Sequence, residues 1–308
     1  MLISYRHPAA KAAGFFYEYP LITGHSLFQE MMQMKCAWQD FLNVLPPELR
    51  IEVDRQGKGG VWELRMRCGE PAEIIGPWGS KWINNTVSKQ DIRYVVNMAS
   101  KYSPWASHTV SEGYLTTSGG HRIGLCGKGV TKGDGLTTIK DPTSLCIRVA
   151  RDHPGIAKGL PDMGSVLIIG KPGAGKTSLL RDFIRHRSET GFSSVAVVDE
   201  RGELFPDGIF HPGKRTDILS GCSKACGIEM VLRTMGPGII AVDEITADAD
   251  CDALLQCGWC GVSLIATAHA SCREELHHRP VYQKLISYRL FDWLVILQQD
   301  KSWKLERM

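Results

Sequence analysis

One stretch of the chain has the residue types and spacing of a loop that binds phosphate groups. It matches the pattern G-x-x-x-x-G-K-[ST] and consists of Gly170, Lys171, Pro172, Gly173, Ala174, Gly175, Lys176 and Thr177, with Ser178 directly after it. Its glycines let backbone N–H groups turn toward anionic oxygens. We expect Lys176 to reach the β- and γ-phosphates of a nucleotide and the Thr177 hydroxyl to bind Mg²⁺. The alternative is a glycine-rich turn without a ligand.

Two apolar strands further along the chain each end in a pair of acids. Asp199 and Glu200 follow one strand, and Asp243 and Glu244 follow the other. In a parallel α/β sheet, ligands bind beyond the carboxyl ends of the strands, where the phosphate loop also opens. We predict that Asp243 holds the Mg²⁺ ion and that Glu244 is the general base that orients the attacking water, with Glu200 as a further catalytic acid. The alternative is that these acids only cap helices.

A third apolar strand ends in a threonine and a histidine, Thr267 and His269. At the carboxyl edge of the sheet both side chains would lie near the γ-phosphate, and we expect His269 to respond to it. A lone histidine is more often a packing residue, so this prediction depends on its place in the order of motifs.

The elements that must position these residues alternate along residues 152–308. Short strands rich in valine and isoleucine are expected at 165–169, 194–198, 238–242 and 263–266. Helical stretches lie between them, including one over 178–187. Near-continuous apolar strands separated by helices indicate a parallel sheet covered on both faces. This segment is therefore predicted to be an α/β domain, entered through a linker at 152–155.

Residues 34–151 mix short strands with helices. Helices are expected over 35–45 and 89–100, a strand-like pattern over 51–75, and short strands around 113–117, 121–126 and 145–149. We predict a smaller α+β domain here. Residues 1–33 show no clear period, and we expect either a mobile leader or an ordinary packed extension.

Composition excludes several classes of protein. The 308 residues fit one large or two modest domains, and a net charge of +3 is too small to argue for nucleic-acid binding. Ten cysteines in a chain of this length argue against a disulfide scaffold, so we expect free, mostly buried thiols in a reducing compartment. No run reaches the roughly 18 apolar residues of a membrane span, and no signal peptide is recognisable. We expect a cytoplasmic protein.

The order of the motifs resembles the secretion ATPase superfamily, the motors of type II and type IV secretion and of pilus retraction. Its Walker A, Asp, Walker B and His boxes correspond here to residues 170–177, 199–203, 232–244 and 264–269. A more specific resemblance is to the stage III sporulation protein AA family, and it covers roughly residues 40–300. Its signatures are SGGHRIGLCG at 118–127, DERGE at 199–203, DIL with GC at 217–222, and IATAH at 265–269.

The resemblance implies an Mg²⁺-dependent ATPase with a RecA-like P-loop domain behind the smaller α+β domain. It places Arg148 and Arg151 where the first domain meets the nucleotide, to neutralise charge on the γ-phosphoryl group; surface salt bridges are the alternative for each. It also implies a homo-hexameric ring that works with membrane-embedded components of the channel between mother cell and forespore. The protein would then lie at the mother-cell membrane through these partners.

Two other functions stay open beside the motor. One is a nucleotide-gated scaffold with little turnover, against which the intact Lys176, Asp243 and Glu244 argue. The other is a DNA-translocating motor, but the first domain lacks a basic run with interleaved aromatics, so no nucleic acid is expected. The motifs do not choose ATP over GTP. Cys257 and Cys260 form a C-x-x-C pair without a second pair at metal spacing, which favours packing over redox or metal chemistry.

Overall fold

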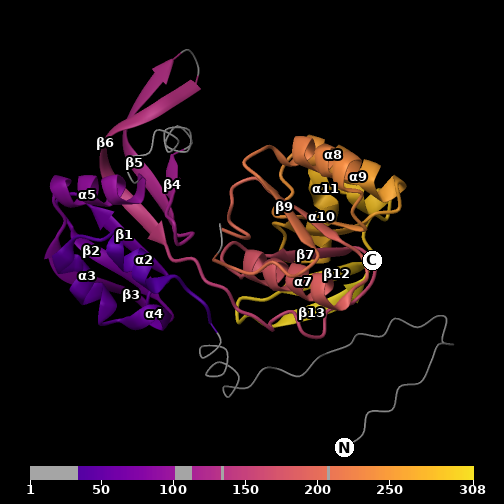
Figure 1. Cartoon of the computed structure of the whole chain (residues 1–308), viewed down its shortest axis with the longest axis horizontal. Helices are drawn as coiled ribbons and strands as arrows, with labels where there is room; N and C mark the ends of the chain where they lie inside the picture. The colour runs from indigo at the N-terminus through magenta and orange to yellow at the C-terminus, as the bar shows by residue number, and fades with distance from the viewer. Residues whose placement is uncertain (1–33, 101–112, 133–134, 207–208) are drawn as a thin grey trace, which may run out of the picture.

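Two β-sheets form the framework of the molecule (Figure 1). The computed structural model describes residues 34–100, 113–132, 135–206 and 209–308. All strands of the first sheet lie between residues 63 and 148, and all strands of the second lie between 166 and 307. The expected leader, 1–33, lies outside the described residues. The predicted domain boundary after residue 151 falls between the two sheets and, as a domain boundary, stays a prediction.

The first sheet is antiparallel throughout, with the strand order β3-β2-β1-β6-β5-β4. Its strands are β1 (Glu63–Arg67), β2 (Pro71–Gly76), β3 (Gly79–Thr86), β4 (Tyr114–Thr116), β5 (Arg122–Lys132) and β6 (Gly135–Arg148). The accompanying helices are α2 (Trp38–Asn43), α3 (Pro47–Asp54), α4 (Gly57–Gly60) and α5 (Lys89–Ser100). Alternate strand residues such as Leu64 and Met66 are buried with Phe41 and Ile92 of the helices, so one face of this sheet carries the core.

The strand-like pattern predicted for residues 51–75 is wrong in its first twelve residues. Residues 51–54 belong to α3 and 57–60 to α4 instead, and strands begin only at Glu63. Pro47 occupies the first turn of α3, where its missing N–H is not needed. Leu49 and Val53, four residues apart, then share the buried face of that helix. Residues 51–54 therefore continue a helix whose buried positions are four residues apart, and the alternating burial of a strand begins only with β1.

The second sheet contains the strands that the sequence predicted and has the order β13-β12-β7-β11-β10-β8-β9. Its strands are β7 (Val166–Gly170), β8 (Val195–Asp199), β9 (Thr216–Ser220), β10 (Ile239–Val242), β11 (Ser263–Ala268), β12 (Trp293–Leu297) and β13 (Trp303–Arg307). All neighbours pair in parallel except β13, which runs antiparallel along β12. The parallel arrangement brings the carboxyl ends of β7, β8, β10 and β11 to one edge.

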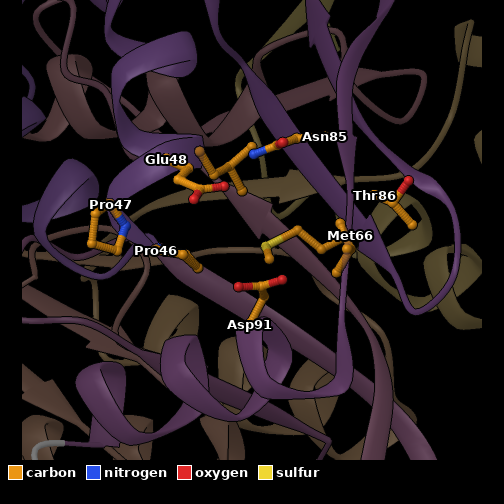
Figure 2. Close-up of a pocket in the computed structure, with 9 residues that line it drawn as sticks. Pro46, Pro47, Glu48, Met66, Asn85, Thr86 and Asp91 are labelled. Carbon is orange, nitrogen blue, oxygen red and sulfur yellow. The ribbon is translucent and has the colours of Figure 1, made fainter.

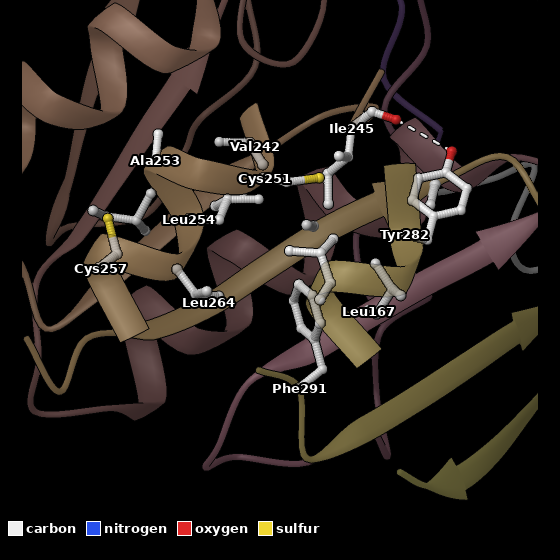
Figure 3. Close-up of a cluster of buried hydrophobic side chains, with 14 of the residues drawn as sticks. Leu167, Val242, Ile245, Cys251, Ala253, Leu254, Cys257, Leu264, Tyr282 and Phe291 are labelled. Atoms are coloured by element: carbon white, nitrogen blue, oxygen red, sulfur yellow. Dashed lines mark hydrogen bonds between the residues drawn. The ribbon is translucent and has the colours of Figure 1, made fainter. Parts of the chain in front are cut away.

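Helices cover both faces of the second sheet. On one face α7 (Lys176–Thr190) packs Leu180 and Phe183 against the strands. The other face carries α8 (Lys224–Met235), α9 (Asp248–Trp259), α10 (Arg273–His278) and α11 (Pro280–Ser287). Figure 3 shows this second core, in which Leu254 of α9 and Tyr282 of α11 lie over strand residues such as Leu264. The strands are thus buried on both sides, which explains their near-continuous apolar runs.

Three strands and the state of the thiols differ from expectation. β9, β12 and β13 were not predicted; β9 and β13 lie at the sheet edges, where partial exposure weakens the apolar pattern. All ten cysteines are free, as expected, but only Cys251 and Cys257 are buried, so the expectation of mostly buried thiols is wrong.

Within the ranges that the structure describes, no helix is long and apolar enough to cross a membrane.

Candidate active site

The phosphate loop joins the end of β7 to the start of α7. Gly173 and Gly175 have φ angles of 75° and 106°, which side-chain-bearing residues rarely adopt. A Cβ at Gly170 would lie 2.9 Å from the Leu297 carbonyl oxygen of the neighbouring β12. Glycine is therefore required at all three positions, by backbone conformation at two and by close approach at the third. The loop has the shape of a cradle at the N-terminus of a fifteen-residue helix.

Lys176 is held inside this loop by three hydrogen bonds. Its ammonium donates to the carbonyl oxygens of Gly170 at 2.9 Å and Lys171 at 3.3 Å, and to Nδ1 of His269 at 2.9 Å. Burial lowers the pKa of Lys176, and the nearby carboxylates of Asp243 and Glu244 oppose that shift. Among the described residues no carboxylate pairs directly with this ammonium, which lies at the mouth of the loop where an anion could replace its present partners.

Thr177, Asp243 and Thr267 form a second set of contacts beside the loop. The Thr177 hydroxyl donates to one carboxylate oxygen of Asp243 at 2.8 Å, and the Thr267 hydroxyl donates to the other at 2.5 Å. Parallel pairing sets Val242 beside Ala266, so Asp243 and Thr267 are the next residues on adjacent strands. Strand register therefore brings together an acid and a hydroxyl that are 24 residues apart in the sequence.

Glu244 is fixed in a left-handed backbone conformation, with φ of 49°. Its N–H donates to the Thr267 hydroxyl at 2.8 Å, and the carboxylate lies 3.0 Å from Nε2 of His269. Because Nδ1 of His269 accepts from Lys176, a neutral ring carries its proton on Nε2 and donates it to Glu244. A non-glycine residue held at positive φ is typical of functional sites, where surrounding contacts offset the strain.

The acids at the end of β8 have other partners. Asp199 is buried and accepts hydrogen bonds from the N–H groups of Glu203, Leu204 and Phe205, so it shapes the loop that follows the strand. Burial raises the pKa of Asp199, and the charge of Asp243 adds to the shift, while the N–H groups of Phe205 and Leu204 and the charge of Arg181 oppose it. Glu200 pairs with the ammonium of Lys224 at the start of α8. The structure does not join Glu200 to the contacts of Lys176, Asp243 and His269.

The two candidate arginines make their contacts with the first sheet and its helices. Arg148 lies at the end of β6, 3.6 Å from the Glu63 carboxylate, and its side chain is 66% exposed. Arg151 donates to the carbonyl oxygens of Lys58 and Val61, and burial lowers its pKa. Because the side chain of Arg148 is exposed, it can turn toward a ligand, whereas the guanidinium of Arg151 is held by hydrogen bonds to backbone carbonyls. No contact of either side chain with the phosphate loop occurs within the described residues.

Two lysines near the site had no recognisable sequence signal. Lys224 pairs with Glu200, and Lys301, in the turn between β12 and β13, donates to the phosphate-loop carbonyls of Gly173 and Ala174 at 2.8 and 3.1 Å. Neither belongs to a motif, and of the two only Lys301 contacts the phosphate loop itself. The pairing of β12 with β7 is what brings the Lys301 turn to the loop.

The residues present fit an Mg²⁺-bound nucleotide. Protein sites for this ion commonly supply one or two carboxylates and leave the other positions to water and substrate phosphates. Thr177 and Asp243, already 2.8 Å apart, offer a hydroxyl and a carboxylate at the mouth of the phosphate cradle. Among the described residues no three His, Cys, Asp or Glu side chains gather as a self-sufficient metal site. Of the C-x-x-C pair, Cys257 is buried and Cys260 is exposed.

A separate cavity lies away from these contacts. Its volume is about 270 Å³, and residues of the first sheet and its helices line it. Figure 2 shows Pro46, Glu48, Met66 and Asp91 among these lining residues. Its lining contains no residue of the second sheet or of the phosphate loop. The candidate active site is therefore defined by its side-chain contacts and not by this cavity.

Comparison with known proteins gives a family match over most of the chain. The family model described as "Sporulation stage III, protein AA" matches residues 39–304. Stage III sporulation protein AA of Bacillus subtilis (strain 168) is 34% identical over 284 residues, which cover 85% of this chain and 92% of that protein.

Solved structures show the same fold. The ATPase DotB of Legionella pneumophila superposes with a TM-score of 0.57 at 18% identity, covering 82% of this chain and 76% of that one. The pilus retraction motor PilT, solved with bound ADP, gives a TM-score of 0.54 at 15% identity, covering 80% and 76%. The fold is therefore a RecA-like P-loop domain that follows a smaller α+β segment, as predicted.

Proposed function

The chain belongs to the stage III sporulation protein AA family, and from that premise we propose that it is an Mg²⁺-dependent ATPase that serves as a motor in endospore formation. One observation carries the proposal. Lys176, Thr177, Asp243, Glu244 and His269 come from three separate segments and meet in one connected set of contacts at the carboxyl edge of the sheet. Fold stability alone does not require such a gathering of polar groups at the mouth of an anion cradle.

Each side chain has a role in phosphoryl transfer to water. The loop N–H groups and Lys176 hold the β- and γ-phosphates, and Lys176 exchanges its carbonyl and His269 partners for phosphate oxygens. Thr177 and Asp243 would hold Mg²⁺, which supplies neutralisation of phosphate charge when bound. Glu244, held by Thr267, orients the attacking water and accepts its proton. His269 contacts both Lys176 and Glu244, so it responds when a γ-phosphate separates them.

We infer the remaining features of the motor from the family and from the fold. Residues 34–151 and 152–308 would be two domains whose relative angle changes with hydrolysis. Arg148 would complete the nucleotide site, with Arg151 fixing the end of the first domain beside it. The assembly would be a homo-hexameric ring. It would act at the mother-cell membrane on membrane-embedded components of the channel to the forespore. Glu200 would act from the neighbouring strand end, after release from Lys224.

Replacing Glu244 with glutamine tests the enzymatic proposal. We expect turnover to fall by on the order of 10²–10⁴-fold, because the amide cannot accept the proton of water, while ATP binding persists. Phosphate release and equilibrium binding of a fluorescent ATP analogue measure the two effects separately. Glu229→Gln removes the same charge from the exposed face of α8 and should leave both unchanged. A wild-type protein that binds ATP without turnover would instead be the nucleotide-gated scaffold.

The mass of the protein in solution tests the ring. We expect wild type and Glu244→Gln to shift to a hexamer-sized species when ATP and Mg²⁺ are added, with the variant holding that state longer. Light scattering coupled to size exclusion measures it. A monomer under all conditions, for both proteins, would contradict self-assembly by the soluble chain.

A further inference from the structure

One face of α7 carries a row of residues that begins at the phosphate site and continues away from it. Thr177, Arg181 and Arg185 follow each other at intervals of four, so they lie on one side of the helix. Thr177 contacts Asp243. Outside the helix, Arg181 and Arg185 contact residues at 151–152, 203–204 and 210–211, and Arg181 is only 4% exposed. A single rigid element thus touches the predicted nucleotide site at one end and other parts of the chain along its length.

Arg181 joins two loops through its guanidinium group. Its Nη1 donates to the Arg151 carbonyl oxygen at 2.6 Å, its Nη2 to that of Glu203 at 2.8 Å, and its Nε to that of Leu204. The group also stacks over the ring of Phe210, 4.6 Å from its centre. Burial lowers the pKa of Arg181 to about 10, so it stays charged at neutral pH. The planar fork of arginine allows these bonds in only one arrangement of the two loops.

The segment between the two sheets is held by α7 at further points. Asp182 accepts hydrogen bonds from the N–H groups of Gly155 at 2.9 Å and Ala157 at 2.8 Å. Arg185 bridges Asp182 and Asp152, both at 2.6 Å. Together with Arg181 on the carbonyl of Arg151, these contacts fix residues 151–157 to the helix that starts in the phosphate loop.

The second loop that Arg181 holds leads to the first sheet. Residues 203–205 are also anchored by Asp199, at the end of β8. The side chain of Glu203 pairs with Arg122 on β5. The guanidinium of Arg181 therefore contacts two connections between the sheets. One is the chain segment that follows β6, and the other is the ion pair between Glu203 and Arg122.

We propose that Arg181 is the positioning residue that couples occupancy of the phosphate loop to the segment 151–157 and to the loop 203–205. This inference rests on the proposed function in taking a nucleotide as the ligand. A ligand that binds at Lys176 and Thr177 shifts or stiffens the first turn of α7, and a rigid helix passes that change to Arg181 one turn later. Because the guanidinium bonds to both loops at once, neither loop keeps its contacts unless it follows the helix.

A matched pair of variants tests the coupling. Arg187 is a second buried arginine on α7, but it donates to the carbonyls of Pro161 and Gly164, ahead of β7. Arg181→Met and Arg187→Met thus remove the same kind of contact from the same helix. Hydrogen–deuterium exchange of the full-length chain is measured at peptides spanning 151–158 and 199–206, with and without a non-hydrolysable ATP analogue and Mg²⁺. Binding of the same analogue and ATP turnover are measured in parallel.

We expect the analogue to slow exchange of both peptides by about 5-fold or more in wild type and in Arg187→Met. In Arg181→Met the protection should vanish while the analogue still binds, and turnover should fall without a matching loss of affinity. If Arg181→Met does not fold, Arg185→Met, a less buried site on the same row, should show partial loss of protection at 151–158.

Three results would overturn the proposal: wild type without protection of the two peptides, protection kept in Arg181→Met, or protection lost equally in Arg187→Met. The fate of the proposed function is read separately. A wild-type chain that is protected by the analogue but does not hydrolyse ATP would support the coupling and refute the ATPase.

Discussion

At the scale of single residues, Thr267 is the side chain on which the arrangement of the acids depends. Its hydroxyl donates to Asp243 and accepts from the N–H of Glu244, and the residue is completely buried. The same hydroxyl thereby fixes the position of the Asp243 carboxylate, which is predicted to hold the metal ion, and of the backbone of Glu244, which is predicted to act as base. Both predicted roles depend on a group that does not itself take part in the chemistry.

Thr267→Val removes that hydroxyl while keeping the shape of the side chain. The change leaves a donor and an acceptor unpaired, so we expect the free energy of unfolding to fall by about 1–3 kcal/mol. Misplacement of Glu244 should lower turnover by about 100-fold. Urea unfolding and phosphate release measure the two effects. Thr267→Ser, which keeps the hydroxyl, should hydrolyse ATP nearly as wild type does; equal activity of the valine variant would refute the role of Thr267.

At the scale of elements, His121 ties the end of the first sheet to its first helix. The buried ring accepts from the N–H of Ala150, just after β6, and its Nε2 donates to the carbonyl of Ala37, at the start of α2. Burial lowers the pKa of His121, and Arg151 adds to the shift, whereas the Ala37 carbonyl and Asp40 oppose it. The neutral ring is thus part of the folded structure, since protonated Nδ1 could no longer accept.

Stability should therefore depend on pH below neutrality. The unfolded chain binds the His121 proton near its ordinary pKa of about 6.5, and the folded chain does so only at lower pH, so stability is lost as pH falls below that value. The limiting slope is about 1.4 kcal/mol per pH unit for each such proton. His121→Gln should reduce the slope of the unfolding free energy against pH by the amount that corresponds to about one proton. Some slope should remain, because burial also lowers the pKa of His153. An unchanged slope, measured by urea unfolding between pH 5 and 7.5, would contradict this assignment.

At the scale of the whole molecule, the ion pair between Arg122 and Glu203 joins the first sheet to the loop behind β8. Arg122 also lies over the ring of Tyr114, 4.3 Å from its centre, so the arginine is fixed on its own side. Both side chains are partly exposed, which limits the energy of the pair to about 1 kcal/mol or less. The pair matters because of where it lies: Arg181 donates to the backbone carbonyl of Glu203, so the ion pair links Arg122 of the first sheet to α7 through one residue.

Charge reversal tests this connection. Arg122→Glu and Glu203→Arg should each speed cleavage of the 151–158 segment by a broad-specificity protease, by up to about 5-fold. The double variant restores opposite charges and should return the rate toward wild type. Limited proteolysis followed by mass spectrometry measures the rates. A double variant cleaved as fast as the faster single variant would show that the pair does not contribute.

The sequence alone determined the phosphate loop, the parallel sheet behind it and the strands that end in Asp243 and Thr267. These features follow from short-range rules: glycines where φ is positive, a hydroxyl and an ammonium at fixed spacing, and apolar runs whose length and composition suit strands buried on both faces. Helix α5 was predicted with the bounds that the structure gives it, because its apolar residues repeat with a clear helical period.

Only the tertiary structure decided which polar groups have which partners. Glu200 and Glu244 have equivalent places in the sequence, yet one pairs with Lys224 and the other with His269. Arg181 belongs to no motif and nevertheless bonds to two loops. A motif is a statement about neighbours along the chain, whereas the contacts of a long charged side chain depend on which elements pack within its reach. That packing is set by strand order and register, and the spacing of residues along the chain does not record it.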